Sequence, residues 1–231
     1  MLHDLACAQS RLPSLDVQVV VFNEGRLSKL LRERRIATFV LPEREMSTFS
    51  LVAGCRRIMK RFVPDVVHSH RIKEDIVGGI AAALEGGIRC VRTVHGVDEA
   101  QTVSLRARFS RAAQERCVRR LFAASVAVSR PLQRQLEARF GSDRVFFIAN
   151  GVDLEQFGGT TRATVTDCRI RIGMVGRLVP IKRVDVFLNM AAIISRRMPG
   201  RFQFLIYGDG PEAGRLVQMS EPSRSNHRRR R

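Results

Sequence analysis

Arg177 and Lys182 are the residues whose types and spacing most directly suggest chemistry in this sequence. They lie in the loop 176–182 (GRLVPIK), between an apolar run rich in β-branched residues at 170–175 and a helix predicted at 184–198. A guanidinium can bind two phosphate oxygens through a fork of N–H groups, and an ammonium adds a point charge. The start of the helix contributes N–H groups and partial positive charge. The loop therefore predicts an anion-binding site.

A second loop is predicted at the same edge of the sheet. Residues 202–207 form another apolar run, which is followed by Gly208, Asp209 and Gly210. Two strands joined by a helix are almost always parallel, so their carboxyl ends share one edge, where open α/β sheets bind ligands. Glycine permits a tight turn and a close approach of the backbone to a ligand. Each loop alone is a weak signal, and by composition alone the two cations also fit an ordinary solvated surface.

Three histidines fall near predicted strand ends. His95 follows the apolar run 88–94, and His68 and His70 lie on one face of the strand predicted at 66–70. A histidine at a strand end either serves a site or forms a hydrogen bond with the backbone, and both interpretations are open for His95. His68 and His70 have a spacing that suggests a metal pair. The sequence offers no third ligand, so structural roles are favoured for them.

The first 150 residues alternate between predicted strands and helices. This alternation is typical of an α/β fold with a doubly wound, mostly parallel sheet. His95 and the turn after Ser69 should then lie at the carboxyl edge of that sheet. The predicted strands are 17–22, 36–41, 66–70, 88–94, 125–128 and 145–148, and the predicted helices are 1–9, 27–35, 48–62, 74–84, 106–122 and 131–140, the last capped by Ser129.

The chain divides into a larger N-terminal part and a smaller C-terminal part. Residues 1–150 are predicted to form a nearly complete Rossmann-like domain, residues 151–167 a linker, and residues 168–217 part of a second such domain. The arginine-rich stretch 218–231 lacks periodicity and is predicted to be disordered. A two-stranded sheet cannot bury both of its faces, so the C-terminal part is expected to be the less stable one.

Composition limits the classes of protein that fit. Apolar residues make up 45% of the chain, which is enough for a hydrophobic core and excludes a disordered protein. The net charge is +18 and is spread through every segment, which leaves unspecific binding to nucleic acid or an anionic membrane as an option. The five cysteines lack metal-ligand spacing and are predicted to be reduced. Neither a signal peptide nor a membrane-spanning apolar run is evident, so a soluble cytoplasmic protein is expected.

Four landmarks occur in the order expected of a known family. They are DVVHSHR at 65–71 with RTVHG at 92–96, VAVSRPL at 126–132, IANGVDLEQF at 148–157, and GMVGRLVPIKRVDVFL at 173–188 followed by LIYGDGPE at 205–212. The chain thereby resembles the retaining, nucleotide-sugar-dependent glycosyltransferases of family 4, whose GT-B fold has two Rossmann-like domains. The resemblance covers roughly residues 1–217.

The resemblance implies roles for particular residues. The implied catalytic residues are the histidine near the transferred sugar and the two cations of the family's GR-x(4)-K pattern, which bind the donor diphosphate: His95, Arg177 and Lys182. The residues implied to bind the donor are Gly176, Arg177, Lys182, Gly208, Asp209 and Gly210.

The resemblance also implies a reaction and its partners. A sugar would pass with retention from a nucleotide-diphosphate sugar to a glycan or lipid-linked acceptor, in the synthesis of polysaccharide, lipopolysaccharide or glycolipid. No cofactor or metal is expected, and the absence of any Asp-x-Asp sequence agrees with a site built from cations alone. The net charge leaves peripheral contact with an anionic membrane as an option, and specific binding to nucleic acid is not expected.

Parts of the family pattern are missing from the sequence. The family's first strand and glycine-rich loop would precede Met1, and the Glu-x(7)-Glu segment that contacts the donor would follow Arg231. The family's domain-closing C-terminal helix is also not found. The chain is therefore expected to be a fragment, and whether it is active by itself is open.

Two other classes of function fit parts of the pattern. A nicotinamide-dependent oxidoreductase would share the Rossmann-like units, but the near match to G-x-G-x-x-G at Gly208 is one residue too long and follows the second strand. A basic module that binds nucleic acid or a membrane surface would use the net charge instead. Removal of residues 221–231 would distinguish a charge organised on the fold from one supplied by the tail.

Overall fold

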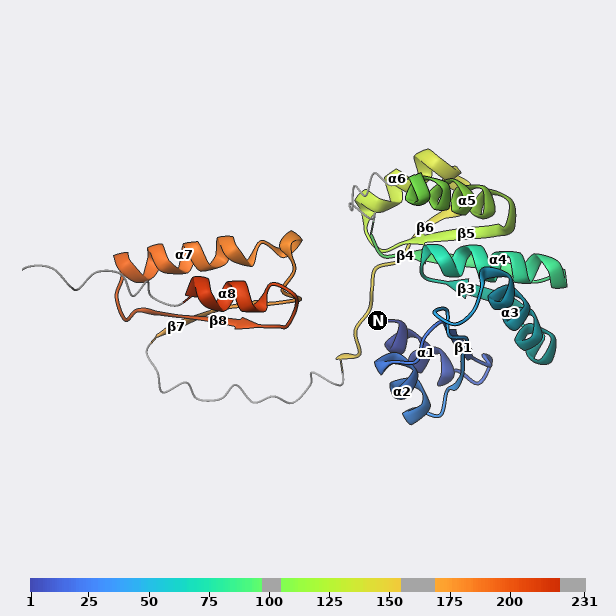
Figure 1. Ribbon diagram of the computed structural model, residues 1–231, viewed down its shortest axis with the longest axis horizontal. Coiled ribbons are helices and arrows are strands. Elements are labelled where there is room, and N and C mark those ends of the chain that lie inside the picture. Colours follow the sequence, from blue (N-terminus) through green and yellow to red (C-terminus); the bar gives the residue numbers. More distant parts are fainter. Residues whose placement is uncertain (97–104, 155–168, 221–231) are drawn as a thin grey trace, which may run out of the picture. The chain divides into compact units, whose positions relative to one another are not determined.

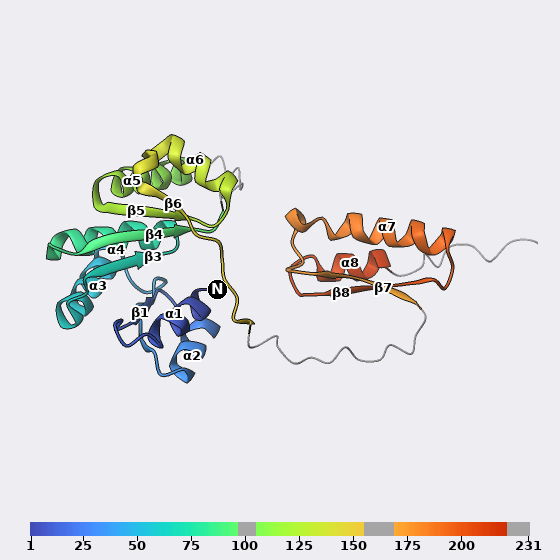
Figure 2. The ribbon, with the colours of Figure 1, turned by 180° about the vertical axis from the view of Figure 1, so that it is seen from behind.

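The computed structural model describes residues 1–96, 105–154 and 169–220. The chain folds into two compact units, Met1–Gly158 and Gly159–Arg231, which we call the N-terminal and C-terminal units (Figures 1 and 2). Most of the linker predicted at 151–167 lies outside the described residues, as do Cys168 and the tail from residue 221. Both units combine helices with parallel strands, so the predicted α/β class is confirmed.

The N-terminal unit alternates strands and helices along its whole length (Figure 1). Its strands are β1 (Gln18–Val21), β2 (Ala37–Val40), β3 (Val66–Ser69), β4 (Arg89–Val94), β5 (Phe122–Ala127) and β6 (Val145–Phe147). Its helices are α1 (Leu2–Ser10), α2 (Arg26–Glu33), α3 (Thr48–Phe62), α4 (Ile72–Glu85), α5 (Leu105–Leu121) and α6 (Arg130–Phe140), with a 3-10 turn η1 (Ser142–Arg144) before β6. Each predicted element is present, with ends that differ by a few residues.

All strand pairs of this unit are parallel, as the alternation predicts. The strands nevertheless form two sheets: β1 pairs with β2, and β3, β4, β5 and β6 follow one another in a second sheet. The sequence predicts a single sheet, but the pair β1–β2 is not hydrogen-bonded to the sheet that begins with β3. The pattern of strands and helices determines the direction of each strand, but it does not determine which strands exchange hydrogen bonds.

An apolar cluster shared by two helices holds the two sheets together. Phe22, just after β1, packs with Leu51 and Cys55 of α3 and with Val77 and Ala81 of α4. The neighbouring cluster again includes a residue of α4 and consists of Ala82, Cys90, Val118 and Phe122. Helix α4 thus connects both sheets, and its first turn lies at the carboxyl end of β3.

The end of α5 differs from the prediction for a physical reason. The periodicity places Phe122 in the helix, but α5 ends at Leu121, and Phe122 begins β5 opposite Cys90. The Phe122 side chain is 4% exposed and packs in the cluster with Cys90 and Val118. Tertiary burial of a large aromatic ring therefore outweighs the local preference for helix.

Within residues 169–220, the C-terminal unit has two fully paired parallel strands and two α-helices. Strand β7 (Ile170–Val175) is joined to β8 (Phe202–Tyr207) through a 3-10 turn η3 (Pro180–Lys182) and helix α7 (Val184–Arg197). Helix α8 (Ala213–Ser220) follows β8. Residues 218–220 are therefore helical, which corrects the prediction that the disordered tail begins at residue 218.

One face of the β7–β8 pair carries the core of this unit. Met174 and Ile206 pack there with Val184 and Leu188 of α7 and with Leu216 of α8. On the other face, Val175 is 81% exposed and Tyr207 is 59% exposed. The lower stability expected for this unit has the same cause, a sheet with one open face, and it remains a prediction.

Two expected absences can be examined within the described ranges. Cys7, Cys55, Cys90 and Cys117 are free thiols, and burial raises the pKa of Cys55 and of Cys90 to about 11. No helix in these ranges is long and apolar enough to cross a membrane.

Candidate functional site

The two loops that carry the predicted donor-binding residues lie against each other at one edge of the C-terminal unit. Backbone hydrogen bonds continue past the ends of β7 and β8: the Gly176 amide donates to the Tyr207 carbonyl at 3.0 Å, and the Leu178 amide donates to the Asp209 carbonyl at 2.9 Å. The Glu212 amide donates to the Leu178 carbonyl at 3.2 Å. The side chain of Leu178 is buried in the core. The edge is therefore a pair of interlocked loops rather than two independent turns.

Glycine is required where these loops touch. A Cβ atom on Gly208 would lie 1.8 Å from the carbonyl oxygen of Gly176, and one on Gly210 would lie 2.3 Å from the carbonyl oxygen of Leu178. Both obstacles are backbone atoms, which cannot move aside by a change of rotamer. The GDG sequence is thus explained first by loop-to-loop packing, which the sequence-based prediction of close approach to a ligand did not foresee.

Replacing Gly208 by alanine should destabilise the C-terminal unit by at least about 2 kcal/mol, because the two loops must separate to admit the methyl group. Gly214→Ala is the matched control, since nothing lies within 4 Å of a Cβ at that helical position, and alanine should be neutral or favourable there. The stability of each variant is measured by thermal unfolding, which is followed through the fluorescence of Tyr207 and the amide resonances of β7 and β8. Equal stability of the two variants would show that the loops are not packed in this way.

Arg177 and Lys182 are exposed on the loop edge, and neither side chain forms an ion pair or a hydrogen bond with any residue in the described ranges. The two predicted cations are therefore free to meet an anion. Arg183 differs from them, because its guanidinium donates two hydrogen bonds to Asp185, both at 3.2 Å.

The start of helix α7 differs from the expectation. Lys182 belongs to the turn η3, and Arg183 is the N-cap, in the left-handed conformation with φ of 48°. The hydrogen bonds from Arg183 lower the pKa of the Asp185 carboxylate, and backbone N–H groups of this first turn lower it further. The helix start already holds a negative charge, so binding of a further anion would rest on Arg177 and Lys182 rather than on the helix N–H groups.

The N-terminal unit brings three histidines together at the carboxyl edge of β3 and β4. Nδ1 of His70 lies 3.1 Å from Nε2 of His95, and the His68 ring centroid lies 4.3 Å from that of His70. Nε2 of His68 lies 2.8 Å from Oγ1 of Thr93. The carboxyl-edge position predicted for His95 and for the turn after Ser69 is confirmed. The sequence did not indicate that His95 would pair with His70.

A carboxylate missed by the sequence analysis lies at the same edge of this unit. Glu43, after β2, accepts hydrogen bonds from Lys73 Nζ at 2.7 Å and from Asn23 Nδ2 at 2.7 Å. The bond from Lys73, then that from Asn23, lowers the pKa of Glu43. Lys73 is one of four lysines among 40 basic residues, and Lys182 is another. Their rarity is the sequence signal that could have drawn attention to Lys73.

A buried ion pair lies beneath the histidines. Asp75 of α4 and Arg92 of β4 are 3% and 4% exposed, and Arg92 Nη1 lies 3.3 Å from Asp75 Oδ2. Asp75 also accepts hydrogen bonds from Ser69 Oγ at 2.5 Å and from Gln114 Nε2 at 2.6 Å. These contacts tie β3, α4, β4 and α5 together. They fix the strand ends from which His70 and His95 project.

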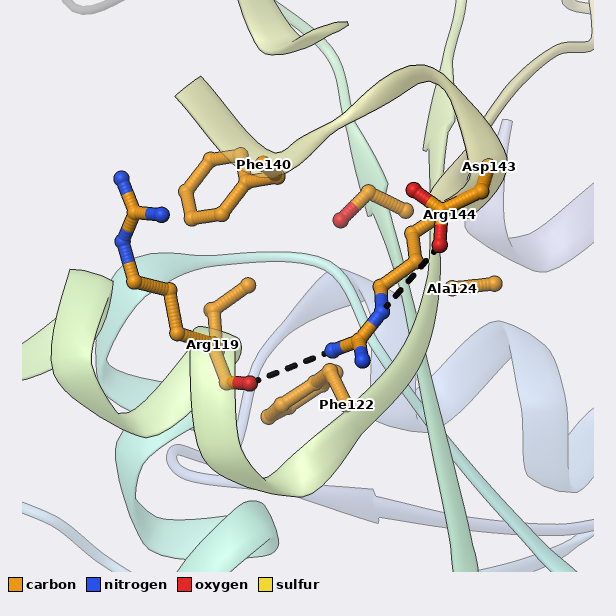
Figure 3. A pocket seen from close by; sticks show the side chains of 8 residues that line it. Arg119, Phe122, Ala124, Phe140, Asp143 and Arg144 are labelled. Carbon is orange, nitrogen blue, oxygen red and sulfur yellow. Dashed lines mark hydrogen bonds and ion pairs between the residues drawn. The ribbon is translucent and has the colours of Figure 1, made fainter.

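A pocket of the N-terminal unit contains none of the predicted site residues (Figure 3). It measures about 330 Å³ and lies between α5, the start of β5, and the segment that leads from α6 into β6. Its two arginines are already engaged: Arg144 donates to the Arg119 carbonyl at 3.2 Å, and Arg119 donates to Glu115 at 3.0 Å. The third charged residue of the lining, Asp143, lies 3.8 Å from Arg144, so each charged side chain there already has a partner.

The predicted residues thus fall into two groups. Gly176, Arg177, Lys182 and the segment 208–210 share the loop edge of the C-terminal unit, and His95 belongs to the N-terminal unit. Among the residues that the structure describes, no three His, Cys, Asp or Glu side chains are arranged to hold a metal ion.

Comparison with known proteins shows which protein family the chain resembles. Residues 2–156 match the family model described as Glycosyltransferase Family 4. A GDP-mannose-dependent alpha-mannosyltransferase of Mycobacterium tuberculosis is 32% identical over 170 residues, which cover 69% of this chain and 43% of that protein. A UDP-Gal:alpha-D-GlcNAc-diphosphoundecaprenol alpha-1,3-galactosyltransferase of Escherichia coli is 29% identical over 167 residues, covering 67% of this chain and 43% of that protein. The chain thus spans less than half the length of these relatives.

Solved structures share the fold at lower sequence identity. Anabaena HepE in complex with UDP has a TM-score of 0.70 and 19% identity, and the match covers 94% of this chain and 60% of that one. A UDP-GlcNAc 2-epimerase of Neisseria meningitidis bound to UDP-GlcNAc has a TM-score of 0.60 and 19% identity, covering 89% of this chain and 60% of that one. These similarities confirm the predicted pair of Rossmann-like units, the second of them partial.

Proposed function

The chain belongs to glycosyltransferase family 4, and we propose that it forms part of an enzyme that transfers a sugar from a nucleotide-diphosphate sugar to an acceptor with retention of configuration. In this proposal the C-terminal unit binds the donor and the N-terminal unit faces the acceptor. The two relatives named above take a GDP-sugar and a UDP-sugar according to their names, which is why either nucleotide is a candidate donor here.

The observation that supports the donor site most directly is the pair of unpaired cations on the loop edge. Cleavage of the bond between sugar and phosphate places negative charge on the departing diphosphate. Arg177 and Lys182 are exposed and free of partners among the described residues, while the neighbouring Arg183 is neutralised by Asp185. Fixed cations that meet the developing charge stabilise the transition state more than the ground state. The proposal assigns this charge stabilisation to Arg177 and Lys182 and requires no metal.

The interlocked backbone of the two loops would make these cations effective. Gly208 and Gly210 allow the loops to touch, and hydrogen bonds of 2.9 to 3.2 Å hold them together. A rigid support lowers the cost of placing a charge where the diphosphate forms. Asp209 is committed within the loop, because its Oδ1 accepts a hydrogen bond from the Gly210 amide at 2.7 Å. Asp209 is therefore proposed to shape the donor loop rather than to contact the donor.

We propose an acceptor that is a glycan or a lipid-linked sugar, in the cytoplasm or at the inner face of a membrane, within cell-envelope synthesis. The relative from Escherichia coli uses a diphosphoundecaprenol-linked acceptor according to its name. A net charge of +18 would favour peripheral contact with an anionic membrane surface.

Transfer assays with a complete version of the protein test the proposed reaction. UDP- and GDP-sugars labelled in the sugar are offered with lipid-linked and free glycan acceptors, and NMR reads the anomeric configuration of the product. The expected result is transfer from one nucleotide class with the configuration of the donor retained. An inverted product would reject the retaining mechanism, and hydride transfer to a nicotinamide without sugar transfer would reject the whole proposal.

A further inference from the structure

His70 and His95 meet edge to edge at the carboxyl edge of the N-terminal unit. Nδ1 of His70 lies 3.1 Å from Nε2 of His95, and the ring planes are inclined by only 6°. The ring centroids are 5.4 Å apart, much farther than the two nitrogens. The rings therefore share a plane instead of stacking face to face. In a shared plane the lone pair of one nitrogen points along the N–H bond of the other, which is the geometry of a hydrogen bond.

Both rings are neutral at neutral pH. Burial, then the charges of His68 and His95, lowers the pKa of His70 to about 4. Partial burial and then the positive amino terminus of Met1 lower the pKa of His95. A neutral imidazole has one N–H and one lone pair, so only one of the two facing nitrogens carries a proton. The pair is thus a directional hydrogen bond with a defined donor.

The identity of the donor follows from the chemistry of imidazole. If His95 donates, both rings carry their proton on Nε2, and if His70 donates, both carry it on Nδ1. The Nε2–H form is the more stable tautomer of an isolated neutral histidine, so donation by His95 suits both rings at once. Nδ1 of His95 then keeps its lone pair, and no residue within the described ranges bonds to that atom.

The surroundings hold His70 in place for this role. The His68 ring lies against one side of it, with centroids 4.3 Å apart, and His68 is itself fixed by the Thr93 hydroxyl at 2.8 Å. Ser69, the residue before His70, is anchored through its hydroxyl to the buried Asp75. Rotation of the His70 side chain away from His95 would lose its contact with the His68 ring.

We propose that His70 is a positioning residue that holds His95 in the Nε2–H tautomer, so that Nδ1 of His95 is left to accept a hydrogen bond from a hydroxyl group of a sugar substrate. The kind of ligand rests on the proposed function. The tautomer of His95 does not, and it can be measured on the chain without any substrate.

The test is the long-range ¹H–¹⁵N correlation spectrum of the histidine rings at neutral pH. The chain has five histidines, so substitution of single residues is enough to assign the signals. In the unsubstituted chain, Nε2 of His95 should have the ¹⁵N chemical shift of a protonated nitrogen, and Nδ1 should have that of an unprotonated nitrogen. In His70→Leu the two shifts should move toward each other, because His95 then exchanges between tautomers. In His70→Asn they should remain separated, because the amide oxygen stands close to the place of Nδ1.

Substitution of His3 supplies the control, because its side chain forms hydrogen bonds only within α1. His3→Ala should leave the His95 signals unchanged. The backbone amide spectrum reports whether each variant folds. A proton on Nδ1 of His95 in the unsubstituted chain would overturn the proposal even if no variant folds. Unchanged separation of the His95 shifts in a folded His70→Leu variant would overturn it as well. If the tautomer is as expected but sugar transfer is absent from the complete protein, the proposed function fails and the pairing stands.

Discussion

Replacing Asp75 by alanine is expected to lower the free energy of unfolding of the N-terminal unit by about 3–5 kcal/mol, the loss typical when one partner of a buried ion pair is removed. Arg92 is 4% exposed, and burial lowers its pKa while the charge of Asp75 opposes that shift. Without the carboxylate, the guanidinium would keep its bond to Ser125 at 2.9 Å and its position 4.7 Å from the Phe140 ring centroid. Neither contact supplies a negative charge, so an uncompensated buried charge remains.

Hydrogen exchange of the β4 amides measures this loss, since β4 is one of the two central strands of the four-stranded sheet and should open only when the unit unfolds. Glu115→Ala is the matched control, because it breaks an ion pair of 3.0 Å with Arg119 in which both side chains are well exposed. That change should cost no more than about 1 kcal/mol. Combining Asp75→Leu with Arg92→Met should cost less than Asp75→Ala alone, since no charge is then stranded. Equal losses for Asp75→Ala and Glu115→Ala would mean that water reaches the Asp75 site.

Features that depend on short-range patterns could be predicted from the sequence. Ser129 caps α6 by accepting a hydrogen bond from the Leu132 amide, and a capping serine before a proline is a local signal. The parallel direction of β7 and β8 follows from the helix that joins them. The meeting of segments 176–178 and 208–210 follows from that direction in turn. Each of these inferences needs only neighbouring residues or a single crossover.

Features that depend on contacts between distant elements could not be predicted in the same way. Whether β1 and β2 join the sheet that begins with β3 depends on which strand edges meet. The alternation of strands and helices is the same for one sheet and for two. The pair His70 and His95 depends on ring orientation, which spacing does not specify. The occupation of the α7 start by Asp185 depends on a left-handed residue at Arg183, a conformation that no sequence rule assigns to arginine.

The ion pair of Asp75 and Arg92 is an intermediate case. Asp75 falls three, four and seven residues before Gly78, Gly79 and Ala82, which are all buried, so an acid interrupts the apolar face of α4. Arg92 likewise interrupts the apolar strand at 88–94. Two opposite charges in faces that must be buried imply a partner for each. The sequence therefore contained the signal that a buried pair exists, although the identity of the partners required the fold.

Replacing Arg177 by alanine is expected to lower the turnover of the complete enzyme by about a hundredfold or more, because a preorganised charge contact to a developing anion contributes about 3 kcal/mol. Arg177→Lys should restore only part of this, since an ammonium cannot reproduce the two-pronged contact of a guanidinium with phosphate oxygens. Arg183→Ala is the matched control on the same loop. Its guanidinium is already bound to Asp185, so its loss should change turnover far less.

Calorimetry on the chain itself shows whether Arg177 contributes to binding of the diphosphate or to binding of the nucleoside. UDP and GDP are compared with uridine and guanosine, for the unsubstituted chain and for Arg177→Ala. The substitution should weaken binding of the diphosphates and leave binding of the nucleosides unchanged, because Arg177 and Lys182 are proposed to meet only the phosphates. Salt should reduce the diphosphate affinity of the unsubstituted chain more than that of the variant, since exposed charges are screened. Equal losses for diphosphate and nucleoside would point to a disturbed loop, and no loss for either would make Arg177 an ordinary surface arginine.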